Sequence, residues 1–202
     1  MGSSTFSGPV RSEAGFDEIT KNTTTGAVTT VRALTVSQIT AGTGITSGTG
    51  TVYDGTITKE ILGSVTYFYT RIYIDLTGLN DGGSTLDIIG APTASANCHL
   101  GQFTTAANGT IYIGKMTCLE APTTGGADID LYTAVEATGV EDTLITDLDE
   151  TLLLNAGTST LNSQDDITII PIVDSYLYLA GVTASNATYD AGKLLIEFWG
   201  VT

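Results

Sequence analysis

Cys98 and His99 stand next to each other and come nearest, by residue type, to a catalytic pair. A cysteine thiol becomes a strong nucleophile when an imidazole can take its proton. Neighbouring residues of a strand point to opposite faces, however, so these two side chains should diverge. The chain also has no G-x-S-x-G turn that would carry a serine nucleophile. We therefore predict a protein that is not an enzyme.

Paired carboxylates are the second group that could do chemistry, because they can bind calcium or serve as acid and base in glycoside hydrolysis. The pairs are Asp128 with Asp130, Asp147 with Asp149 and Glu150, and Asp165 with Asp166. No EF-hand loop or other complete set of calcium ligands surrounds them. A solvated acidic rim is the favoured interpretation. Calcium binding and a polysaccharide-degrading enzyme are the weaker alternatives, and we expect no cofactor.

The cysteines do not indicate a metal site, because two cysteines and one histidine cannot form an ordinary four-ligand zinc centre. Cys98 and Cys118 are expected to be buried free thiols, with a disulfide between adjacent strands as the alternative. The glycine-rich stretch "GTGITSGTG" lacks the G-K-[ST] ending and the following helix of a phosphate-binding loop. We interpret it as a linker.

The stretch "SVTYFYTRIYIDLTGL" alternates between two faces, as a strand does. One face carries Phe68, Ile72 and further residues and is predicted to face the core. The other face carries a tyrosine row, Tyr67, Tyr69 and Tyr73. Exposed aromatic side chains on a sheet bind sugars or bury against a neighbouring subunit. The row could also line the second sheet of a sandwich, and these three interpretations stay open.

Composition and turn signals indicate an all-β protein. Charged residues make up only 14% of the chain, and Gly, Thr, Val, Ile and Tyr favour strands and turns. Roughly eight strands follow residue 57 with no helix of ordinary length between them. This pattern predicts a β-sandwich or jelly-roll body. The Asn108-Gly109 pair predicts a hairpin turn, and the apolar "GKLLIEFWGVT" predicts a central strand or a strand between sheets.

The chain is predicted to have two parts. Residues 1–56 are poor in large apolar side chains and should form an extended N-terminal arm and linker, and residues 57–202 should form the β-sandwich body. Alone the arm could bury little apolar surface, so it should pack on another subunit. Its expected anchors are Phe6, Pro9, Val10 and Phe16. The strand-like "AVTTVRALTV" is a candidate for addition to a neighbour's sheet edge.

The acidity of the chain limits its partners. Seven Lys and Arg residues against 22 Asp and Glu residues give a net charge of −15. Such a surface repels nucleic acid and anionic membranes. No apolar run approaches the roughly 20 residues that span a membrane, and no basic and apolar leader is recognised at the start. We expect neither nucleic acid nor a membrane as a partner.

The segment "STFSGPVRSEAGF" near one end and the segments "YLYL" and "DAGKLLIEFWG" near the other resemble virion structural proteins of tailed bacteriophages, many of them marine. The first segment is followed by a stretch rich in Thr, Gly and Val. The other two lie at Tyr176 to Leu179 and at Asp190 to Gly200. The strand-rich middle is similar in character. No repeated fibre segment is recognised, which departs from long-fibre proteins.

The resemblance implies a capsid decoration, or cement, protein with a β-sandwich or jelly-roll body, often trimeric, on the outer surface of the capsid. Its partners would be the major capsid protein and further copies of itself, and its location would be the virion. An arm that becomes ordered on docking can cover a wide seam between subunits. The tyrosine row supports an alternative, a head- or tail-fibre module that binds host surface glycan.

Overall fold

The computed structural model describes residues 17–21, 24–25, 28–33, 39–44, 48, 50–51, 53–92, 96–183 and 185–202. By its internal contacts the chain divides into two units, Met1–Gln38 and Ile39–Thr202. The expected arm anchors lie outside the described residues, so their contacts stay predictions. These anchors are Phe6, Pro9, Val10 and Phe16.

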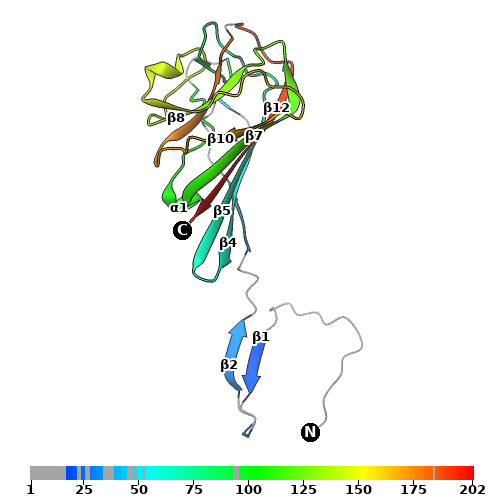
Figure 1. Cartoon of the computed structure of the whole chain (residues 1–202), viewed down its shortest axis with the longest axis vertical. Coiled ribbons are helices and arrows are strands. Elements are labelled where there is room, and N and C mark those ends of the chain that lie inside the picture. The colour runs from blue at the N-terminus through cyan, green and yellow to red at the C-terminus, as the bar shows by residue number, and fades with distance from the viewer. Residues whose placement is uncertain are drawn as a thin grey trace. The chain divides into compact units, whose positions relative to one another are not determined.

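The first unit contains a short hairpin (Figure 1). Strand β1 (Asp17–Lys21) pairs in antiparallel register with β2 (Val28–Ala33), with an irregularity between Thr20 and Lys21. The strand-like "AVTTVRALTV" therefore contains a strand, as predicted. Its partner is a segment of the same chain, so this part of the first unit is a hairpin rather than a fully extended arm.

The second unit contains a six-stranded antiparallel sheet with the order β10-β7-β12-β5-β4-β3. Its long strands β7, β12, β5 and β4 run side by side in Figure 1. The strands are β3 (Ile39–Gly44), β4 (Tyr53–Leu62), β5 (Val65–Asp75), β7 (Thr110–Thr123), β10 (Gln164–Ile167) and β12 (Ala191–Val201).

A four-stranded antiparallel sheet with the order β6-β11-β8-β9 completes this unit. Its strands are β6 (Asp87–Ile88), β8 (Ile129–Ala134), β9 (Glu150–Leu154) and β11 (Tyr176–Gly181). The helices of the described residues are single turns, α1 (Thr105–Asn108) and a 3-10 turn (Ile145–Asp147). The described part of the chain is mostly β-sheet, which is consistent with the predicted all-β class.

The second unit begins earlier in the chain than the boundary predicted at residue 57. β3 pairs with β4, and β4 pairs with β5, so residues 39–56 group with the six-stranded sheet. Backbone hydrogen bonds join these strands, and Thr and Gly supply them as well as apolar residues do. The sequence of β3, "ITAGTG", lacks the apolar alternation by which a strand is recognised.

Strand β12 lies between β7 and β5 at the centre of the six-stranded sheet, which confirms the prediction of a central strand. Its residues alternate between half-buried and buried positions along their whole length. Ile196 and Phe198 belong to the main core, together with Leu131 of β8 and Leu179 of β11. The core is therefore built from side chains of both sheets.

The four-stranded sheet is buried on both faces. Every residue of β8 is buried. Ile129 and Leu131 belong to the main core, whereas Tyr132 belongs to a second apolar cluster with Tyr178 and Ile145. Loop segments cover this second face, so the four-stranded sheet has little solvent-exposed surface of its own.

The Asn108-Gly109 pair does not form the predicted hairpin turn. It ends helix α1, with Gly109 at φ 67° after the last helical residue. The reason lies in the buried Asn108 side chain, whose Oδ1 accepts from the Thr104 N–H at 3.0 Å and whose Nδ2 donates to Thr70 Oγ1 at 2.9 Å. These bonds favour a helical turn that packs against β5.

Substitutions in β12 should separate its two faces. Ile196→Ala removes a fully buried side chain and is expected to lower the free energy of unfolding by about 2–5 kcal/mol. Leu195→Ala, on the half-exposed face, should lower the free energy of unfolding by only about 1 kcal/mol. The reason is that the Leu195 side chain buries less apolar surface on folding than the Ile196 side chain does. Guanidinium unfolding followed by circular dichroism measures both. Equal losses would contradict this assignment of faces.

Candidate binding site

The outward face of the six-stranded sheet, opposite the core face, carries aromatic side chains in a cross-strand row. The register places Tyr69 of β5 opposite Thr58 of β4 on one side and Trp199 of β12 on the other. Ile113 of β7 follows Trp199 in the same row. The rings of Tyr69 and Trp199 stack, with centroids 5.3 Å apart and an angle of 21° between their planes.

The sheet face is hollowed beside this aromatic pair. The hollow has a volume of about 330 Å³. We call it the aromatic hollow, and it is lined chiefly by Thr58, Glu60, Tyr67, Tyr69, Tyr112 and Trp199. Tyr67 and Tyr112 are 41% and 54% exposed. Aromatic walls with a few polar groups are typical of small-molecule sites.

A register shift between β12 and β7 brings Tyr112 to the hollow. Trp199 pairs with Ile113 and the next residue, Gly200, pairs with Ile111, so Tyr112 is the extra residue of a bulge. A bulge of this kind redirects side chains locally. Gly200 has no Cβ, and one built there would lie 2.0 Å from the Asn108 carbonyl oxygen. The close approach of the backbones therefore requires glycine at this position.

Tyr69 is held in place from its hydroxyl end. Its O–H donates to the Glu197 carboxylate, and the Arg71 guanidinium lies 5.5 Å from the centre of its ring. Partial burial, followed by the hydrogen bond to Glu197, raises the pKa of Tyr69 to about 12. The phenol is therefore neutral at physiological pH, and its ring is fixed beside Trp199.

Charged side chains occupy the next cross-strand row. Arg71, Glu197, Lys115 and Asp166 lie on four adjacent strands, and their charges alternate in sign. Farther along the same face, Lys193 pairs with Glu120. Exposed pairs of this kind contribute little stability. Their effect here is to bound the aromatic row with a strongly hydrated strip.

The three interpretations of the tyrosine row can now be compared. Tyr67 is exposed and Tyr69 and Tyr73 are half-buried on the outward face, so the idea that they line the second sheet was wrong. Tyr67 and Tyr69 line the aromatic hollow, whereas Tyr73 lies opposite Asp54 and Leu195 and does not. Sugar binding and burial against a subunit both stay open for this face.

The sequence interpretation missed Trp199, Glu60 and Tyr112 as members of this site. Trp199 could have been found from strict alternation in β12, which places its side chain on the same face as Glu197 and on the other face from Phe198. No comparable signal exists for Tyr112, because the bulge that places it depends on the pairing of β7 with β12.

The Cys98-His99 pair shows no activation of the thiol. Burial raises the pKa of Cys98 to about 11, and burial lowers the pKa of His99. The thiol donates to the Ala96 carbonyl, while the imidazole packs against Tyr176 with ring centroids 4.9 Å apart. Both groups are therefore neutral near pH 7. Cys118 is likewise buried, and the expectation of two free thiols is confirmed.

The interpretation of the paired carboxylates as a solvated rim fits the exposed Asp147, Asp149 and Asp166 but was wrong for Asp130. Asp130 is buried, accepts from the Ala156 N–H and has its pKa raised chiefly by burial. Asp81 is fully buried and accepts from the Gly126 N–H and from the Ala187 N–H at 2.9 Å, which ties three loop segments together. Among the described residues, no three or more His, Cys, Asp and Glu side chains are grouped so that they could hold a metal ion.

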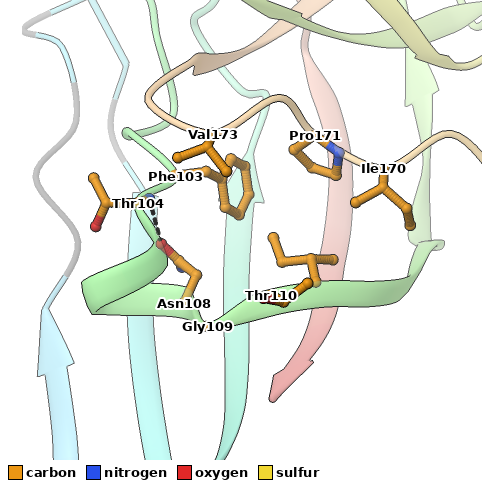
Figure 2. A pocket seen from close by; sticks show the side chains of 9 residues that line it. Phe103, Thr104, Asn108, Gly109, Thr110, Ile170, Pro171 and Val173 are labelled. Atoms are coloured by element: carbon orange, nitrogen blue, oxygen red, sulfur yellow. Dashed lines mark hydrogen bonds between the residues drawn. The ribbon is translucent and has the colours of Figure 1, made fainter. Parts of the chain in front are cut away.

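A second, smaller cavity lies between α1 and the loop before β11 (Figure 2). Its volume is about 80 Å³, and Phe103, Asn108, Ile170, Pro171 and Val173 are among its lining residues. This is well below the ~300–1,000 Å³ of ordinary ligand pockets. The surrounding loop exposes apolar side chains to solvent, namely Ile169, Ile170, Ile172 and Val173. We call residues 169–173 the apolar loop.

Comparison of the chain with protein-family models, with curated proteins and with solved structures finds no match. Within the described residues, no helix has both the length and the apolar character needed to cross a bilayer.

Both thiols should resist modification in the native protein. Ellman's reagent at pH 8 is expected to detect no thiol before unfolding and two per chain in guanidinium, because buried cysteines with raised pKa values form little thiolate. Cys118→Ser is the matched control, leaving Cys98 alone to report one thiol after unfolding. Rapid labelling of the native Cys118→Ser variant would contradict the burial of Cys98.

Proposed function

We propose that the protein is a non-enzymatic capsid decoration protein of a tailed bacteriophage. In this proposal a β-sandwich or jelly-roll body sits on the outer surface of the capsid, and the N-terminal unit attaches it to the major capsid protein. The body associates as a homotrimer. The observation that carries the proposal is the division of the chain into a small N-terminal unit and a larger β body.

The N-terminal unit supports an attachment role. Its described structure is a two-stranded hairpin, and such a hairpin is marginally stable in water by itself. Docking on a partner would bury apolar surface, and this gain would offset the entropy lost on ordering. The segment "STFSGPVRSEAGF", which resembles virion proteins, directly precedes β1 in the chain and so belongs to this same N-terminal unit.

The body offers uncharged surface for contacts with the lattice or with further copies. In a chain of net charge −15, the apolar loop carries five consecutive uncharged residues, and Ile172 and Val173 are 49% and 56% exposed. A protein that binds only the assembled lattice stabilises it by mass action. Cementing of the shell therefore needs no chemistry beyond binding.

Removal of residues 1–38 should weaken capsid binding at least about tenfold and leave the body folded, because Ile39–Thr202 has its own core. The cut lies after β2, so it does not split the hairpin. Co-sedimentation with shells that lack the protein measures binding, and circular dichroism measures folding. Phe6→Ala with Phe16→Ala in the full chain is the milder test. Unchanged binding of a folded truncated body would reject the attachment role.

The abundance of the protein tests the function itself. Quantitative mass spectrometry of purified virions should find it in a fixed ratio to the major capsid protein, since each lattice position offers the same contacts. Shells that lack it should break at lower temperature. A handful of copies per virion would instead indicate a tail or fibre component.

A second candidate function is a head- or tail-fibre module that binds host surface glycan. The aromatic hollow on the outward sheet face favours it, because Tyr67, Tyr69, Tyr112 and Trp199 come together there.

A further inference from the structure

The aromatic hollow has the size of a small-molecule site rather than of a protein interface. At about 330 Å³ it falls at the lower end of the range for ligand pockets. A stable protein interface instead buries about 800 Å² on each partner. The hollow is bounded on one side by the hydrated row that contains Arg71 and Glu197, which limits the apolar area.

Its walls combine two kinds of contact. The rings of Tyr67, Tyr69, Tyr112 and Trp199 offer π faces and edges, against which weakly polarised C–H groups pack well. Glu60 supplies carboxylate oxygens that accept hydrogen bonds, and Thr58 supplies a hydroxyl that donates and accepts. A pyranose presents both surfaces that such a wall requires, a face of C–H groups and an edge of hydroxyls.

The charge of the hollow selects among saccharides. Its one charged lining residue among those described is Glu60, and the whole chain carries −15. Sialic acid, uronic acids and sugar phosphates would be repelled by this field. We propose that the aromatic hollow binds a neutral saccharide of one or two rings. This inference deepens the second candidate function and does not depend on capsid decoration.

The part of the hollow formed by Tyr69 and Trp199 is organised before a ligand arrives. The Tyr69 hydroxyl donates a hydrogen bond to the Glu197 carboxylate, and the Tyr69 ring stacks on Trp199. The buried Phe68 lies between Tyr67 and Tyr69 in β5 and anchors this part of the strand in the body. A preorganised aromatic wall loses little side-chain freedom when a sugar binds.

The full chain carries its own reporter, because its single tryptophan is Trp199. Titration with cellobiose, maltose, lactose and N,N′-diacetylchitobiose should change the Trp199 emission in a saturable way for at least one sugar, with a Kd of about 0.1–10 mM. The anionic 3′-sialyllactose should bind more weakly than lactose. Absence of a saturable change for all four neutral sugars overturns the proposal, and so does preferential binding of sialyllactose.

Matched variants localise the binding. Tyr67→Ala and Tyr112→Ala, both exposed in the hollow, should raise the Kd about three- to tenfold. Tyr73→Ala lies on the same face of the same strand as Tyr67 but outside the hollow, and should leave the Kd unchanged. Equal effects of Tyr67→Ala and Tyr73→Ala, or no effect of either hollow variant, would contradict the assignment.

The same titration separates this proposal from capsid decoration. The Tyr67→Ala variant should lose sugar affinity and still co-sediment with shells. If capsid shells change the Trp199 emission and no sugar does, the outward face is a protein interface and the saccharide proposal is overturned. If sugars change the Trp199 emission and the full chain does not co-sediment with shells, the saccharide proposal stands and the decoration function fails.

Discussion

The pairing of β12 with β5 on one side and β7 on the other is the constraint on which the body depends. Burial alternates along the whole of β12, so that of every two successive residues one side chain faces the core and the other faces outward. Phe198 packs on Phe103 in the interior, with ring centroids 4.8 Å apart, and Trp199 stacks on Tyr69 outside. The candidate site and the core are thus held by the same backbone hydrogen bonds.

The outward face separates aromatic from charged contacts although the two rows are adjacent. Glu197 belongs to the charged row by its register and to the aromatic site by its hydrogen bond with Tyr69. This link gives one carboxylate of an acidic chain a specific structural role. Asp81 has a comparable role in the loops, where burial is tolerated because backbone N–H groups satisfy the carboxylate.

Strands with a one-sided apolar pattern could be predicted from the sequence, and those without one could not. The alternation in residues 65–75 identified both the core face and the tyrosine face, and burial confirms it. β3 was missed because Thr and Gly leave no periodic signal, and Asn108-Gly109 was misassigned because its bonds to Thr104 and Thr70 are tertiary. The aromatic hollow could not be predicted in full, because Tyr112 reaches it through the bulge of β7, and that bulge depends on the pairing of β7 with β12.

The central place of β12 has a consequence for biosynthesis. β4 and β5 form a local hairpin, and β7 pairs with β10, which follows β8 and β9 in the chain. The strand that pairs with both β5 and β7 is β12, residues 191–201. Until that segment leaves the ribosome, the edges of β5 and β7 are unpaired and open to strands of other nascent chains. Closure of the sheet therefore waits for residues 191–201, because every other strand of this sheet precedes them in the chain.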